Sequence, residues 1–161
     1  MNKKVFLTLI IVLFCLAFIQ KIKAAEQGNY FIQTSVHTIH YSNKDYQNNH
    51  QNLLGLEYHY PSDLLYGFSY FKNTYGQSTR YFYFGKYYEL YQFNNFSITS
   101  KLTFGIVDGY DNSSDNYHTW MHDMETFPGI VAGVGIKKDS FRLDIIPFAD
   151  AGIIILSGIE F

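Results

Sequence analysis

Residues 151–161 read AGIIILSGIEF, and their side chains alternate between the two faces of an extended chain. One face carries three isoleucines and Ser157 and ends in Phe161. The other face carries Ile154 and Leu156, followed by Gly158 and Glu160. This period of two residues predicts a β-strand, because the side chains of a helix repeat every 3.6 residues instead.

Seven further segments are extended in the same way, and no helical period persists between them. They are residues 29–39, 52–60, 64–73, 79–91, 96–108, 126–136 and 141–147. Most of the eight are near the roughly 9–11 residues that a tilted strand needs to cross a bilayer. We therefore predict an all-β fold, an eight-stranded antiparallel up-and-down transmembrane β-barrel.

The connections between the predicted strands alternate in length. Short turns fall at residues 61–63, 92–95 and 137–140. Mostly longer connections fall at 40–51, 74–78 and 109–125, whereas the connection at 148–150 is short and fits less well. Bacterial barrels have short periplasmic turns and longer external loops. The pattern predicts a barrel in the outer membrane of a Gram-negative bacterium, with its longer connections outside.

Alternation also assigns the two faces of each strand. In the first strand, Tyr30, Ile32 and Val36 share one face, and the other face carries Gln33, Ser35 and His37. The polar face is expected to line the lumen. Further lumen residues are predicted in other strands: Glu57, His59, Lys101, Thr103, Arg142 and Asp144. Side chains just fill the interior of an eight-stranded barrel, so we expect contacts between these charges and no open pore.

A soluble lipocalin-like barrel or a β-sandwich is the alternative architecture. Lipocalin-like barrels also have eight strands and walls rich in Phe and Tyr, but their apolar face points inward. Alternation by itself does not distinguish inside from outside. The loop lengths and the aromatic residue at position 161 favour the membrane protein.

Residues 1–24 have the features of a cleaved export signal. Lys3 and Lys4 precede an apolar run that extends from Val5 to Ile19, and the small residue Ala24 follows. A run of about 15 residues is short for a transmembrane helix. We expect a signal peptide at 1–24 and a single barrel domain at 25–161; the alternative is an uncleaved N-terminal anchor.

The composition supports a membrane environment. The chain has 15 Tyr and 15 Phe, which suits an outer wall in lipid and rims at the membrane interface. Its 14 Asp and Glu exceed its 12 Lys and Arg, which argues against a nucleic-acid partner. Phe161 resembles the terminal signal that the bacterial barrel-assembly machinery reads. Expected partners are that machinery and membrane lipids, both phospholipid and lipopolysaccharide, and we expect the protein to be a monomer.

Three polar residues are predicted to meet at the external rim. The first and third strands both run outward, so His37 near the end of one should approach Asn73 and Thr74 at the end of the other. A histidine can act as a general base and a hydroxyl as a nucleophile or proton donor. The alternative interpretation is three ordinary polar residues at a rim.

The same segments resemble the PagP family of outer-membrane lipid A palmitoyltransferases. Phe71-Lys72-Asn73-Thr74-Tyr75 and Ser35-Val36-His37 are similar to the two segments that carry that family's site. Gly85 matches the glycine at the floor of the family's acyl pocket, and Ile145-Ile146-Pro147 matches a Tyr-Ile-Pro segment. The resemblance implies that an acyl chain is transferred from a phospholipid to lipid A. His37, Asn73 and Thr74 would then be catalytic and Gly85 substrate-binding, with no cofactor.

This chain departs from the family where the chemistry matters, because Asn73 and Thr74 replace its Asp-Ser pair. An Asn amide does not accept a proton as a carboxylate does. A shorter segment, His40-Tyr41-Ser42-Asn43, resembles a motif of the lipid A deacylase PagL. That family places its motif in the second half of the chain, and we interpret this match as coincidence.

The connection at 109–125 contains His118 and His122, whose spacing could hold a metal on a helix. It also contains Asp111 and Asp115, which with Asp108 could bind a divalent cation. Solvated loop residues are the simpler interpretation, so no metal site is predicted.

Three functional hypotheses follow. The first is a PagP-like enzyme that acts on acyl chains at the outer leaflet. The second is a non-enzymatic outer-membrane barrel with a structural, adhesive or lipid-binding role, in which the loop 109–125 carries the function. The third is a soluble lipid carrier.

Overall fold

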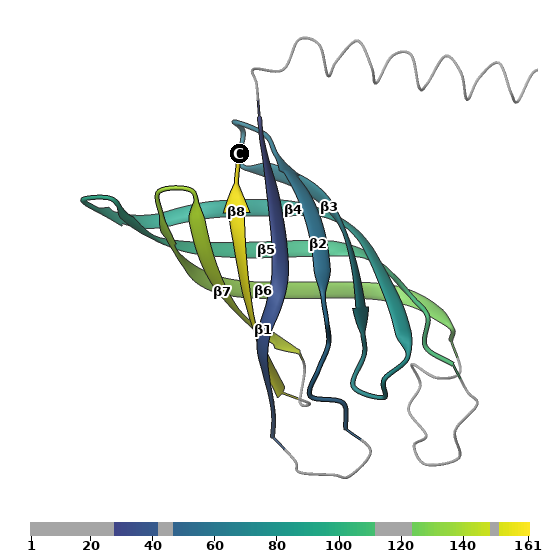
Figure 1. Ribbon diagram of the computed structural model, residues 1–161. Coiled ribbons are helices and arrows are strands. Elements are labelled where there is room, and N and C mark those ends of the chain that lie inside the picture. The colour runs from purple at the N-terminus through teal and green to yellow at the C-terminus, as the bar shows by residue number, and fades with distance from the viewer. Residues whose placement is uncertain (1–27, 42–46, 112–123, 149–151) are drawn as a thin grey trace, which may run out of the picture.

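The computed structural model describes residues 28–41, 47–111, 124–148 and 152–161. In these ranges the regular secondary structure consists of β-strands (Figure 1). The eight strands are β1 (Asn29–His40), β2 (Leu54–His59), β3 (Leu64–Lys72), β4 (Ser78–Phe93), β5 (Phe96–Asp108), β6 (Thr126–Lys138), β7 (Phe141–Phe148) and β8 (Gly152–Glu160). Within these residues no helix has the length and apolarity needed to cross a bilayer.

Each strand pairs antiparallel with its neighbour in the sequence, and β1 pairs with β8 to close the barrel. Ile32, for example, lies opposite Leu56 of β2 on one side and Ile159 of β8 on the other. The predicted eight-stranded antiparallel up-and-down barrel is confirmed. Closure also excludes the β-sandwich, since a sandwich has two separate sheets.

The two ends of the barrel differ as the connection lengths predicted. β1 begins and β8 ends at one rim, uppermost in Figure 1, where Tyr30 and Phe161 exchange backbone hydrogen bonds of 2.9 and 2.8 Å. The three short turns share this rim, which we call the turn rim. Asp63, Asn94 and Asp139 have φ of 63°, 53° and 52° there. Asn and Asp tolerate this left-handed conformation better than most residues, which explains their positions. The described parts of the longer connections lie at the opposite end, the loop rim.

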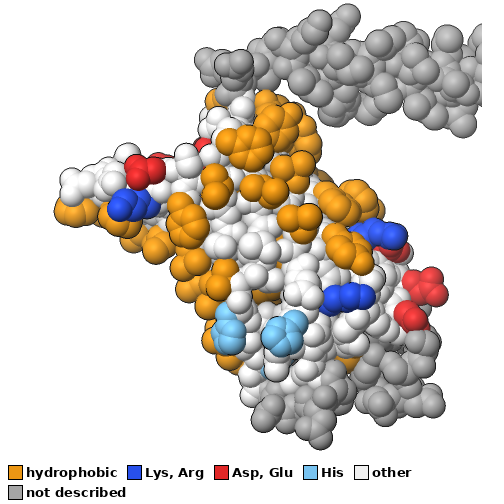
Figure 2. Space-filling view, viewed as in Figure 1, with side chains coloured by type: hydrophobic (Ala, Val, Ile, Leu, Met, Phe, Trp, Pro, Cys, Tyr) orange, Lys and Arg blue, Asp and Glu red, His pale blue; other side chains and the backbone are white. Residues whose placement is uncertain are grey.

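The outer wall of the barrel is apolar. Side chains such as Phe84 on β4 and Ile130 on β6 are 65% and 70% exposed; Phe84 alternates with buried neighbours and Ile130 with half-buried ones. Figure 2 shows apolar side chains over much of the barrel surface towards the turn rim. A soluble lipocalin-like barrel would turn these faces inward.

Aromatic rings cluster on this wall at the turn rim. Tyr58 is the centre of the cluster, with ring centroids 5.0 Å from Tyr30, 4.9 Å from Tyr60 and 5.5 Å from Tyr66. Phe161 stacks on Tyr30 at 6.0 Å. Such rings, apolar with a polar tip in Tyr, suit a boundary between hydrocarbon and water.

The interior contains packed apolar side chains as well as polar ones. Leu53, Ile146, Ile154 and Leu156 form one buried cluster, against which Phe71 packs. A second cluster contains Leu65 and three tyrosines, Tyr81, Tyr83 and Tyr87. These side chains help to fill the lumen, as expected for eight strands.

Candidate functional site

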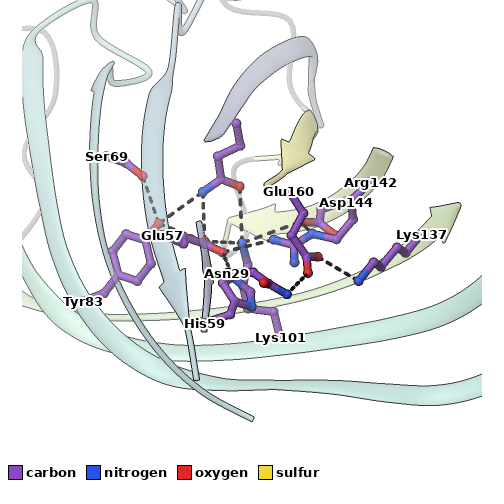
Figure 3. A network of polar contacts seen from close by, with 11 residues as sticks. Asn29, Glu57, His59, Ser69, Tyr83, Lys101, Lys137, Arg142, Asp144 and Glu160 are labelled. Atoms are coloured by element: carbon purple, nitrogen blue, oxygen red, sulfur yellow. Dashed lines mark hydrogen bonds and ion pairs between the residues drawn. The ribbon is translucent and has the colours of Figure 1, made fainter. Parts of the chain in front are cut away.

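A network of charged side chains lies inside the barrel and is centred on Glu57 of β2 (Figure 3). Glu57 is 1% exposed. Its Oε1 lies 2.7 Å from Lys101 Nζ of β5, and its Oε2 lies 3.1 Å from Arg142 Nη2 of β7. The network therefore connects three strands that are not neighbours in the sheet.

Three further side chains complete the coordination of the Glu57 carboxylate. Gln33 Nε2 and the Tyr83 hydroxyl each donate to Oε1 at 2.9 Å, and His59 Nε2 lies 2.7 Å from Oε2. A buried carboxylate must recover its lost hydration through such contacts. These five partners provide them.

Asp144 balances the second positive charge. Arg142 Nε donates to Asp144 Oδ2 at 3.0 Å, and Lys101 Nζ lies 3.6 Å from the same oxygen. The Arg142 guanidinium also stacks on Phe31, 3.6 Å from the ring centroid. Two acids and two bases thus compensate each other inside the barrel. The predicted lumen positions of Glu57, Lys101, Arg142 and Asp144 are confirmed, and the structure supplies their partners.

The predicted lumen position of His37 is wrong. A β-bulge between Ser35 and His37 shifts the register with β8, so His37 pairs with Ile155 on the outward face. His37 is exposed, whereas the next residue, Thr38, is 4% exposed and points inward. A bulge adds one residue to a strand and reverses the alternation beyond it.

Asn73 holds the turn between β3 and β4. It is 2% exposed, and its Oδ1 accepts hydrogen bonds from the backbone N–H groups of Tyr75 and Gln77 at 2.9 and 3.0 Å. Its Nδ2 donates to Gln77 Oε1 at 3.0 Å. Both ends of the amide are therefore engaged within the turn. This arrangement is an Asx turn, a common structural use of asparagine.

Asn48 connects this turn to the segment after β1. Its backbone N–H donates to Thr74 O at 2.7 Å, and its side chain donates to Asn73 O at 3.2 Å. His40 Nε2 lies 3.0 Å from Asn48 O. Among the described contacts, Asn48 therefore links His40, and not His37, to Asn73 and Thr74. Sequence reasoning missed it because the bulge was not foreseen.

Gly85 faces the interior, where it pairs with Leu65 of β3 and Thr103 of β5. A Cβ at this position would lie 2.1 Å from Leu102 O. Close approach of the neighbouring backbone is thus a structural reason for glycine here. This reason holds with or without an acyl chain nearby.

Several predicted features lie outside the described residues. These are the signal peptide at 1–24, Ser42 and Asn43 of the PagL-like segment, and Asp115, His118 and His122. Of the loop 109–125, residues 109–111, 124 and 125 are described.

The fold and this interior define a closed eight-stranded β-barrel with an apolar outer wall. Among solved structures, the chain is similar to the Yersinia pestis outer membrane protein Ail in a phospholipid bilayer nanodisc. The TM-score is 0.40 at 12% identity, and the match covers 84% of this chain and 100% of Ail. No protein-family model and no curated protein matches the sequence.

Proposed function

We propose that this chain is an integral outer-membrane barrel of a Gram-negative bacterium that acts without catalysis, as a structural, adhesive or lipid-binding surface protein. One observation carries the proposal: the wall is apolar outside, while Glu57, Lys101, Arg142 and Asp144 are buried inside. This is the reverse of a soluble protein and fits a protein with lipid as its outer solvent.

The aromatic cluster at the turn rim supports the same orientation. Tyr and Trp are enriched where a membrane protein meets the interface. Short turns are typical of the periplasmic end of a bacterial barrel, so the turn rim would be periplasmic and the loop rim external. Any surface activity would then belong to the loop rim.

The contacts at the loop rim favour a non-catalytic role. The Asn73 amide is engaged within its turn, and His37 points away from the lumen. A catalytic base must come within hydrogen-bond reach of the group that it deprotonates.

The test combines localisation with insertion. The full chain is expressed in a Gram-negative host, and its membranes are separated by density. We expect the protein in the outer-membrane fraction, resistant to extraction with carbonate. The urea-unfolded chain should also fold into phosphatidylcholine vesicles and become protected from protease along its strands. Recovery as a soluble periplasmic protein would reject the proposal and support a lipid carrier.

Acyl transfer of the PagP type is the second candidate. The contacts of Asn48 favour it, since they link His40 to the backbone carbonyls of Asn73 and Thr74 at the loop rim. Thr74 would supply the hydroxyl, Asn73 would orient the ester, and His37 or His40 would act as base. Gly85 would lie at the base of the acyl site.

Mass spectrometry of lipid A and phospholipids separates the two candidates. An enzyme would add an acyl chain to lipid A in cells that express the chain, and Thr74→Ala would abolish this addition. His37→Ala and His40→Ala would identify the base. Lipid profiles identical to those of an empty-vector strain would reject acyl transfer to lipid A and leave the non-catalytic barrel.

A further inference from the structure

The outward faces of β3 and β4 change in character along the strands. At the loop rim, Lys72 lies opposite Ser78, and one step further Tyr70 lies opposite Arg80. We call these four residues the rim patch. The next outward pair along the strands is Phe68 and Phe82. On these two adjacent strands, basic and hydroxyl groups lie at the loop rim, and aromatic rings follow towards the turn rim.

The polar atoms of the rim patch converge on one hydroxyl. Ser78 Oγ accepts hydrogen bonds from Lys72 Nζ at 2.8 Å and from the Tyr70 hydroxyl at 3.0 Å. An ammonium and hydroxyl groups held this close are suitable donors for the oxygens of a phosphate.

Arg80 adds a second positive charge to the patch. Its Nη1 lies 3.3 Å from Asp108 Oδ2 of β5, and both side chains are substantially exposed, at 59% and 41%. Exposed ion pairs contribute little stability, so an incoming anion can compete for the guanidinium. Asp108 also accepts a hydrogen bond from Thr126 at 2.8 Å and retains that partner if Arg80 turns away.

The apolar wall continues directly from the patch towards the turn rim. The Phe68 and Phe82 rings are in contact, with centroids 4.7 Å apart, and Phe82 is 55% exposed. Ile106 of β5 lies beside Phe82 and is also exposed. Figure 2 shows basic side chains beside the lower margin of the apolar area. The order of polar and apolar groups matches that of a phospholipid or lipid A molecule.

We propose that the rim patch binds the phosphate group of an outer-leaflet lipid, whose acyl chains pack on Phe68, Phe82 and Ile106. The proposal rests on the outer-membrane orientation proposed above. Lys72 and Arg80 hold the phosphate oxygens, with Tyr70 and Ser78 as hydroxyl donors. The occupant is a lipid rather than a free anion because the apolar strip continues the site along the same two strands.

The experiment uses the full chain in micelles of a neutral detergent, so that lipid binding is measured apart from cellular location. The probes are bisphosphorylated lipid A and its dephosphorylated form, and the readout is native mass spectrometry across a lipid titration. The test variant is Lys72→Gln with Arg80→Gln. Lys86→Gln is the matched control, since Lys86 lies on the same face of β4 near the turn rim, opposite Leu64. Circular dichroism verifies that each variant is folded.

The unmodified chain should bind the phosphorylated lipid, and the double variant should bind it about tenfold more weakly, as expected for two exposed charged contacts. Lys86→Gln should bind unchanged, and Asp108→Asn should bind more tightly because it frees Arg80. Equal binding of the dephosphorylated lipid, or by the double variant, would overturn the proposal. Displacement of the lipid by equimolar inorganic phosphate would also overturn it, since the site would then take a free anion. If the protein binds lipid at the rim patch but is not recovered in the outer-membrane fraction, the proposed function is contradicted and the lipid site is not.

Discussion

Arg142 of β7 and Glu57 of β2 are 85 residues apart in the sequence, yet Nη2 and Oε2 lie 3.1 Å apart across the lumen. Both side chains are 1% exposed. Contact between them requires that the sheet be closed, because their strands are not neighbours.

Removal of one member of this pair should strongly destabilise the barrel. Arg142→Met takes a cationic partner from both carboxylates, Glu57 and Asp144. The expected loss is about 3–5 kcal/mol of unfolding free energy. Equilibrium urea titration in vesicles measures it. The double variant Arg142→Met, Glu57→Gln should lose less, since one acid and one base then remain, Asp144 and Lys101, 3.6 Å apart. A single variant as stable as the wild type would show that the ion pair is dispensable.

A lysine on the outer wall should be costly in lipid. Ile130 is 70% exposed and pairs with Phe104 near the middle of β5. If that wall faces hydrocarbon, Ile130→Lys should lower the free energy of unfolding in vesicles by about 2–4 kcal/mol. Asn95→Lys, at an exposed position in a turn at the rim, is the control and should have little effect. A penalty no larger than that of the control would mean that Ile130 does not face lipid.

Gly85→Ala should destabilise the fold even where no acyl chain is bound. The new methyl group would meet the Leu102 carbonyl oxygen of the adjacent strand. Overpacking of this kind costs about 1–3 kcal/mol. Gly129→Ala is a milder control, because its nearest neighbours are side-chain atoms of Val107 and Tyr81. If both variants are equally stable, the close approach of the Leu102 carbonyl does not require a glycine at position 85.

Tyr110, beyond the end of β5, should lose its hydroxyl proton at a higher pH than an ordinary tyrosine. Burial, with a smaller contribution from Tyr75, raises its pKa to about 12, and its ring lies 5.1 Å from that of Phe127. Because the folded pKa exceeds the ordinary value near 10, the packing of Tyr110 is fully stabilising below about pH 10 and is lost as pH rises towards 12. The difference in tyrosinate absorbance between the wild type and Tyr110→Phe isolates this group. A midpoint near pH 10 would contradict the burial of its hydroxyl.

The strands and most of their faces could be predicted from the sequence because both are local properties. Alternation assigned Gln33 and Glu57 to the lumen and Ile32 to the wall, and the structure agrees. Asn and Asp at tight turns likewise carry their own conformational preference.

The error at His37 has a non-local cause. The bulge after Ser35 is visible in the pairing of β1 with β8, more than a hundred residues later in the chain. The partners of Glu57 were unpredictable for the same reason, since they depend on how the strands are staggered around the barrel. The structural role of Asn73 depends on the conformation of its turn, and the sequence alone did not distinguish that role from catalysis.

The pairing of β1 with β8 also has a kinetic consequence. Until β8 has been synthesised and positioned, β1 has one neighbour and exposes a row of unpaired N–H and C=O groups. Contacts between such distant segments form slowly, because a long stretch of chain must first be ordered. The barrel therefore depends on its last strand for completion, and an incomplete chain would present an open edge to any other extended segment nearby.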